Sequence, residues 1–256
     1  MARMILSVPA VTGKLKNQFA IRCREFDVSA AWVKDRYLIK AHTDLAGKPR
    51  GTALDLCCGT GQIGRALKKS GWEVRGLDLC SSMAGSSGKF FPVSEGAAER
   101  IPFKTGAFRL VACRQTVQFL RIKDVFSEVS RVLSPGGIFI VSLTVPFSGI
   151  DAGWLHKIHR FKQPLLLKFY TVESLSAELK KAGFAIKESR RLTVRESLDR
   201  WMARAPELSC RVRREVISMV ENAPAEYRRV HRVEKIRGEV FEDWNWVIFK
   251  AVFQGY

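Results

Sequence analysis

Short apolar runs alternate with amphipathic segments over most of the chain beyond residue 50. The apolar runs are short and rich in β-branched residues, which predicts buried strands at 52–58, 73–79, 109–115, 137–145, 185–194 and 243–253. Between them, apolar residues recur at helical spacing in segments that include 61–71, 124–133 and 171–184. Strands that alternate with helices are typical of parallel βαβ units, so the pattern predicts an α/β protein with a doubly wound sheet.

The pattern changes on both sides of this alternating region. Residues 16–47 are helical in pattern and end at the boundary signal Gly47-Lys48-Pro49, and residues 196–232 form a second helical stretch. These changes predict an N-terminal helical cap (1–50), an α/β core (51–195 and 239–256) with a substrate-side loop and helix (146–170), and a helical lid (196–238).

Basic residues strongly outnumber acidic ones, and the 256-residue chain has a formal net charge of +18. Residues 1–50 hold ten Lys and Arg against four Asp and Glu, residues 187–237 hold fourteen against eight, and residues 154–168 hold four basic residues and no acid. Because the excess is dispersed, we interpret most of it as solvated basic surface. A nucleic-acid partner stays an alternative that the charge alone does not favour.

The remaining composition gives no sign of a membrane, secreted or metal-binding protein. No apolar run approaches the roughly 18 residues of a membrane-spanning helix, and the first residues lack a secretory signal pattern. We therefore expect a cytoplasmic protein without a membrane span. The six cysteines include no C-x-x-C pair, so we expect reduced thiols and no metal site.

A glycine-rich loop follows the first predicted strand. Residues 59–64 read G-x-G-x-x-G, which is the pattern of a turn that brings backbone N–H groups and a helix N-terminus close to a ligand. Asp78 ends the next strand, where an acid binds ribose hydroxyls, and this suits a nicotinamide nucleotide and S-adenosylmethionine equally. Asp55 favours the second, because an acid is badly placed beside a pyrophosphate and well placed beside an α-ammonium group.

Four motifs in order over residues 50–145 resemble those of class I S-adenosylmethionine-dependent methyltransferases. They are Asp55-Leu56-Cys57-Cys58-Gly59-Thr60-Gly61, GLDLCSSM at 76–83, and the segments 96–120 and 128–142. They are most similar to the small-molecule branch, the methyltransferase type 11 or quinone C-methyltransferase-like group. The resemblance implies a Rossmann-like, mostly parallel sheet of seven strands with an antiparallel last strand, together with helical lid elements.

The resemblance also implies a cofactor, S-adenosylmethionine, and the residues that bind it: Asp55, Cys57, Gly59, Thr60, Gly61, Asp78, Leu79, Met83, Ala98, Glu99 and Arg114. Two positions depart from the family pattern. Cys57 stands where the family usually has its first glycine, and Ala97 stands where an Asp often contacts the adenine, so Glu99 or the backbone near Ala98 takes that role.

The methyl acceptor is expected beyond the carboxyl ends of the strands, near the basic segment 154–168. We predict His156, His159 and Gln118 as catalytic residues and Trp32, Trp154, Lys162 and Tyr170 as substrate-binding residues. A histidine there would remove a proton, and the positive charge would suit a small anionic or phenolic acceptor. The alternative interpretation is that both histidines are surface residues and that the aromatic residues belong to the core.

Two other functions stay open at this point. An RNA methyltransferase would use the basic surface, although no appended RNA-binding module is apparent. A non-catalytic or NAD-linked binding protein could use the same fold.

Overall fold

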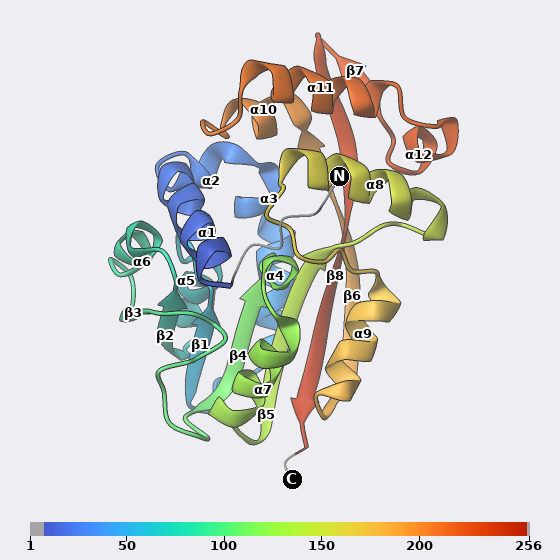
Figure 1. Cartoon of the computed structure of the whole chain (residues 1–256). Coiled ribbons are helices and arrows are strands. Elements are labelled where there is room, and N and C mark those ends of the chain that lie inside the picture. The colour runs from blue at the N-terminus through green and yellow to red at the C-terminus, as the bar shows by residue number, and fades with distance from the viewer. Residues whose placement is uncertain (1–7, 255–256) are drawn as a thin grey trace.

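The computed structural model describes residues 8–254, with side chains from residue 12. One sheet forms its centre (Figure 1), built from β1 Thr52–Leu56, β2 Glu73–Asp78, β3 Val93–Glu95, β4 Phe108–Arg114, β5 Leu133–Thr144, β6 Phe184–Ser197, β7 Glu234–Ile236 and β8 Glu239–Phe253. The strand order is β3-β2-β1-β4-β5-β8-β6, and β7 pairs with β8. Strands β1 to β5 pair in parallel, whereas β8 is antiparallel to β5 and β6.

This arrangement confirms the predicted doubly wound, mostly parallel sheet with an antiparallel last strand. The sheet has eight strands instead of seven, because the three-residue strand β7 forms a hairpin with β8. The strands β3 and β7 were not predicted from the sequence, because three residues are too few to show an alternation of apolar and polar positions.

The sheet lies between two apolar layers because its side chains alternate in direction. In β1, Leu54 and Leu56 face one layer and Ala53 faces the other. Helices α7 Ile122–Val132 and α9 Val172–Lys181 cover the first layer, and α4 Arg36–Ala46 and α5 Gln62–Lys69 cover the second. Helix α6 Ser81–Ser87 packs against β2 and β3.

The strand order reverses beside β1, and this reversal positions the site. Leu56 at the end of β1 pairs with Leu77 on β2 and with Cys113 on β4, so the carboxyl ends of these three strands meet at one edge. Doubly wound sheets bind ligands in the crevice at this point.

Further helices gather beyond that edge of the sheet (Figure 1): α1 Val8–Arg22, α2 Phe26–Ser29, α3 Ala31–Lys34, α8 Gly149–Lys162, α10 Leu198–Ala203, α11 Cys210–Glu221 and α12 Ala225–Val230. The predicted helical region 16–47 is therefore four helices. It divides because Ala30 is extended (φ −153°) and because Asp35 caps α4 by accepting from the Leu38 N–H at 2.7 Å. Among the described residues, no helix combines the length and the apolar character needed to cross a membrane.

Buried polar groups join the outer helices to β8. The Glu242 carboxylate accepts hydrogen bonds from the Tyr227 hydroxyl at 2.9 Å and the Trp244 indole N–H at 2.8 Å. Asp151, whose side chain helps to cap α8, lies 2.9 Å from His231 Nε2. These contacts fix α8 and α12 against β8 and orient the Trp244 ring.

His42 is a buried polar residue between α4 and β5. Its Nδ1 lies 2.7 Å from the Leu38 carbonyl oxygen, which can only accept, so Nδ1 donates and Nε2 accepts from the Ser142 hydroxyl at 2.8 Å. Burial, with a smaller effect of the Arg114 charge, lowers the pKa of His42 to about 3. The ring is therefore neutral in the folded protein at pH values where a solvated histidine is protonated.

We expect His42 to make the protein sensitive to acid. As the pH falls from 6.5 towards 3, only the unfolded chain takes up this proton, since the folded pKa is about 3. The stability linked to His42 is thus fully present above pH 6.5 and falls by about 2 kcal/mol between pH 6.5 and 4.5. Urea unfolding at both pH values should show that His42→Gln loses about 2 kcal/mol less than the wild type over this interval. Equal losses in the two proteins would contradict this assignment.

Candidate active site

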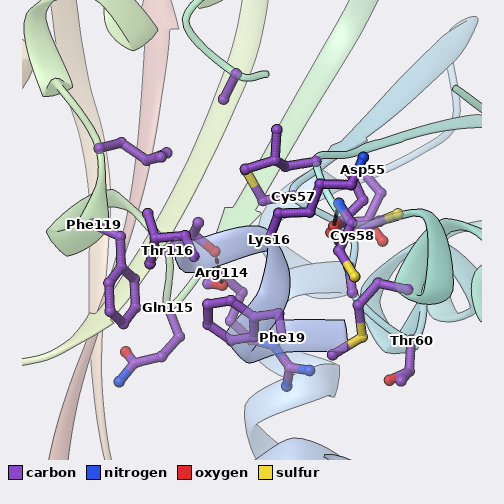
Figure 2. Close-up of a pocket in the computed structure, with 18 of the residues that line it drawn as sticks. Lys16, Phe19, Asp55, Cys57, Cys58, Thr60, Arg114, Gln115, Thr116 and Phe119 are labelled. Carbon is purple, nitrogen blue, oxygen red and sulfur yellow. Dashed lines mark hydrogen bonds between the residues drawn. The ribbon is translucent and has the colours of Figure 1, made fainter. Parts of the chain in front are cut away.

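A cavity opens at the carboxyl ends of β1, β2 and β4 (Figure 2). It encloses about 940 Å³ of space, part of it open to solvent, and every residue predicted to bind the cofactor except Gly61 lines it. Figure 2 shows the loop residues Asp55, Cys57 and Thr60 on one side and Gln115 and Phe119 on the other, with Phe19 of α1 between them. The structure thus brings together residues from five separate segments of the chain.

The glycines of the loop stand at positions where a side chain would be strained or would overlap a neighbour. Gly59 and Gly61 have φ values of +53° and +82°, in the left-handed region that favours glycine. A Cβ on Gly64 would lie 2.3 Å from the Phe91 ring and 2.8 Å from Asp55 Oδ2. This absence of a side chain lets the Gly64 N–H donate to Asp55 Oδ2 at 2.7 Å, which holds the carboxylate at the helix N-terminus.

Asp55 is poised to bind a cation. Its side chain is 3% exposed, and burial raises its pKa to about 7 although the Gly64 N–H and the Arg114 charge act in the opposite direction. A cationic group in the cavity would stabilise the ionised carboxylate and reverse the shift.

Asp78 closes the other side of the loop. Its Oδ2 accepts from the Gly59 N–H at 2.8 Å and its Oδ1 from the Cys80 N–H at 2.9 Å. Burial raises its pKa, and these two N–H groups reduce that effect. Each oxygen keeps a second lone pair for a ligand hydroxyl, which is the geometry a vicinal diol requires.

Arg114 lies at the end of β4, between the cavity and α3. Its guanidinium donates to the carbonyl oxygens of Trp32 and Val33 at 3.3 and 3.2 Å and lies 5.1 Å from the Trp32 ring centroid. Burial lowers its pKa to about 10, and the nearby Asp55 charge opposes this effect. The guanidinium stays charged at neutral pH and supplies a fixed cation next to Asp55.

Cys57 has a backbone conformation that favours the glycine usual at this position of the family pattern. Its φ is +55°, which costs a non-glycine residue about 1–2 kcal/mol, and its thiol packs against Cys113. We expect the free energy of unfolding of Cys57→Gly to lie within about 1 kcal/mol of the wild-type value. That of Cys57→Val should be lower by about 2 kcal/mol, because a β-branched side chain tolerates this φ poorly. Chemical denaturation measures both; a stable Cys57→Val variant would show that the loop relaxes.

The N-terminal helices are tied to this cavity by polar contacts. Asp27 of α2 accepts from the Thr60 hydroxyl at 2.5 Å and from Gln62 Nε2 at 2.9 Å, and Lys16 of α1 forms an ion pair with Glu95 at the end of β3. Sequence reasoning missed Lys16 and Phe19 as lining residues, because their place depends on contacts with segments far along the chain.

A second cavity adjoins the first and shares five lining residues with it: Phe19, Phe26, Trp32, Gln115 and Phe119. Four of these five are aromatic. The Gln115 side chain is held in place, since its Nε2 donates to the Thr144 hydroxyl at 2.8 Å and its Oε1 accepts from the Thr144 N–H at 2.9 Å. Gln115 was not predicted, because nothing in the sequence marks its φ of +55°.

The second cavity receives four of the seven predicted catalytic and substrate-binding residues: Trp32, Gln118, His159 and Lys162. Burial, and then the Lys162 charge, lowers the pKa of His159 to about 3, so its ring is neutral. Burial also lowers the pKa of Lys162 well below its ordinary value. Trp201 and Trp244, which were not predicted as site residues, form the aromatic wall beside them with ring centroids 4.7 Å apart.

The structure does not bring His156, Trp154 or Tyr170 to either cavity. His156 stacks on Phe169 and accepts from Arg160 Nε at 3.2 Å, and Trp154 donates to the Met219 carbonyl oxygen at 3.2 Å. Tyr170 is 1% exposed and belongs to the core beneath α7 and α9. His156 lies beside the cavity that His159 lines because a three-residue spacing turns a helix by about 60°, enough to separate the two rings.

Comparisons with known proteins agree with this geometry. Residues 54–141 match the methyltransferase domain family. Demethylmenaquinone methyltransferase of Chlorobaculum tepidum is 32% identical over 117 residues, which make up 43% of this chain and 48% of that protein. The chain spans about half the length of the first curated relatives that it matches.

Two solved structures share the fold. Protein BH2331 of Bacillus halodurans C-125 has a TM-score of 0.77 at 19% identity, over 85% of this chain and 99% of its own. Geranyl diphosphate C-methyltransferase from Streptomyces coelicolor A3(2), solved with S-adenosyl-L-homocysteine, has a TM-score of 0.58 at 17% identity, over 85% and 78%. Residues 54–141 therefore form a methyltransferase domain, and the fold and the acids of the glycine loop are similar to those of class I S-adenosylmethionine-dependent methyltransferases.

Proposed function

We propose that this chain transfers a methyl group from S-adenosylmethionine to a small-molecule acceptor bound in the second cavity. The observation that carries the proposal is the junction of two cavities, one lined by the glycine loop with Asp55 and Asp78, the other enclosed by aromatic rings. A donor and an acceptor seated in them would meet at the five shared residues.

The residues of the first cavity fit the proposed cofactor. Asp55, with its raised pKa, would bind the α-ammonium group and Arg114 the carboxylate, while Asp78 would accept from the ribose hydroxyls. The backbone of Cys57, Gly59, Thr60 and Gly61 forms the close turn, and Leu79, Met83, Ala98 and Glu99 would surround the adenine. We therefore propose all eleven residues that the sequence predicted as the binding site of the cofactor.

The cofactor would supply a methyl group already activated by its sulfonium. The chain's own part is to align the acceptor with that methyl group and to exclude water. Water would be excluded at the junction by four aromatic side chains, Phe19, Phe26, Trp32 and Phe119. Gln115, the one polar side chain among the described residues that line both cavities, is held by Thr144. An acceptor atom there would attack in line with the carbon–sulfur bond, which breaks as the new bond to the methyl carbon forms.

We propose a small anionic or phenolic acceptor because of the basic groups in the second cavity. His159 and Gln118 would contact it, and His159 would act as a base once the negative charge of the acceptor offsets the burial that lowers its pKa to about 3. The N-terminal helices, residues 146–170 and residues 196–238 would form the cover over both cavities. A cavity of about 730 Å³ with aromatic rings in its lining favours a small acceptor over RNA, and the basic residues of the chain are dispersed instead of forming one RNA-binding surface.

A screen with methyl-labelled S-adenosylmethionine tests the proposal. The protein is freed of bound nucleic acid with nuclease, repurified to remove the nuclease, and incubated with a panel of phenols, carboxylic acids, amines and RNA, and products are scored by mass. We expect label in at least one small acceptor, and none when Asp55→Ala replaces the wild type. Label transferred only to RNA, or to nothing while the cofactor binds, would contradict the proposal.

A further inference from the structure

Unpartnered polar atoms collect in the wall of the second cavity. Gln118 Oε1, His159 Nε2 and Gln163 Nε2 are buried and have no hydrogen-bond partner among the described residues. Their side chains belong to residues that are 6%, 8% and 5% exposed, and all three line this cavity. Buried polar groups are nearly always paired in native proteins, so a group in the cavity is the natural partner for them.

Lys162 adds a buried amine to this wall. It is 4% exposed, and its Nζ lies 3.8 Å from the Trp201 ring centroid. It forms no hydrogen bond or ion pair with any residue in the part of the chain that the structure describes. Two carboxylates act on its pKa: both oxygens of Glu196 accept from the Ala31 N–H, and Glu207 pairs with Arg22 through Oε1, while its buried Oε2 has no hydrogen-bond partner among the described residues.

Lys162 and Gln163 lie away from the place where the methyl group would be transferred. Lys162, Gln163 and Trp201 line the second cavity but not the first. The methyl group would pass at the residues that both cavities share. Lys162 and Gln163 would therefore contact a part of the acceptor that is remote from the methylated atom.

We propose that Lys162 and Gln163 bind a carboxylate carried by an aromatic acceptor, at the end remote from the atom that receives the methyl group. This inference rests on the proposed function for its account of the acceptor. One ammonium and one amide N–H match a single carboxylate, whose two oxygens each accept one of these donors. A phosphate dianion fits less well, since Arg22 beside the cavity is already paired with Glu207.

We infer an aromatic acceptor from the aromatic residues that line the second cavity. Trp201, Trp244 and Phe119 contribute aromatic rings to the lining, the two indoles packing edge to face, and His159 lies 5.4 and 5.5 Å from the indole centroids. Planar ligands bury well against such rings. A carboxylate at Lys162 then directs the opposite end of the molecule towards the junction with the first cavity.

A bound carboxylate should change the pKa of Lys162. Burial and the Arg22 charge lower the pKa of Lys162, whereas Glu207 and Glu196 raise it, and His159 and Arg204 also line the cavity. A bound carboxylate would stabilise the ammonium form and raise the pKa again. Any change in the protonation of Lys162 on binding is therefore an uptake and not a release.

Calorimetry with 2-naphthoate and its neutral isostere 2-naphthamide tests the inference without any methyl transfer. Titrations are made in two buffers of different ionisation enthalpy, with S-adenosylhomocysteine affinity as the control for folding. We expect the wild type to bind the carboxylate about tenfold more tightly than the amide. Lys162→Met should abolish this preference, together with any proton uptake that the two buffers reveal, and Gln163→Leu should reduce the preference.

Lys157→Met is the matched control, because Lys157 lies on the same helix with an exposed side chain over Trp154. It should bind both probes as the wild type does. A wild-type protein that binds the amide as tightly as the carboxylate, or a preference that survives Lys162→Met, would overturn the inference. The test is separate from the proposed function, since failure to methylate any acceptor leaves these binding results unchanged.

Discussion

Gly64→Ala is expected to lose cofactor binding and to destabilise the fold by more than about 3 kcal/mol. The added methyl group would lie 2.3 Å from the Phe91 ring and 2.8 Å from Asp55 Oδ2, and neither neighbour is a flexible side-chain end free to move aside. Relief of both overlaps requires Phe91 and Asp55 to move together, or the start of α5 to shift. Either movement breaks the 2.7 Å hydrogen bond that fixes the Asp55 carboxylate.

Gly85→Ala provides the control for this substitution. Gly85 also lies in a helix, and a Cβ there would meet nothing within 4 Å. Because alanine favours helices, this variant should be as stable as the wild type or slightly more stable. Denaturant unfolding and S-adenosylhomocysteine titration of both variants measure the difference. A Gly64→Ala protein with wild-type stability and affinity would show that the loop geometry described above is wrong.

Trp32→Ala is expected to lower the unfolding free energy by about 3–5 kcal/mol and to abolish methyl transfer. Trp32 is 9% exposed, with its ring centroid 5.3 Å from that of Trp246 and 6.0 Å from that of Phe26. It lines both cavities, so its removal leaves a void in the core and admits water at the junction.

Tyr37→Ala removes an aromatic ring of similar size from the neighbouring helix α4, where the side chain is 60% exposed. It should change stability by less than about 0.5 kcal/mol. Trp32→Phe should restore much of the stability and part of the turnover. If Trp32→Ala methylated an identified acceptor at the wild-type rate, the reacting atoms would have to meet elsewhere.

The sequence predicted the fold and the first cavity because both depend on local patterns. Alternating apolar residues specify strands such as β1, and the close turn at Gly59, Gly61 and Gly64 leaves its mark in the glycine spacing. The acids at the ends of β1 and β2 are separated by a fixed βαβ unit, so their convergence follows from topology.

The second cavity could not be predicted in the same way. Its walls come from α1, α3, α8, α10 and β8, whose arrangement depends on tertiary packing rather than on spacing. His159 and Lys162 were found because basic residues gather in one segment, but the same reasoning also selected His156, Trp154 and Tyr170. Which face of α8 points inward is decided by contacts with Trp201 and Trp244, far along the chain.

Titration of the full chain with S-adenosylhomocysteine, alongside NADH and the Asp78→Ala variant, tests the central claim most directly. We predict micromolar affinity of the wild type for S-adenosylhomocysteine, no binding of NADH, and a loss of about 1.5–3 kcal/mol of binding free energy in Asp78→Ala, because a charge-assisted contact to the ribose disappears. Binding of NADH in its place, or equal affinity of the wild type and Asp78→Ala for S-adenosylhomocysteine, would contradict the account.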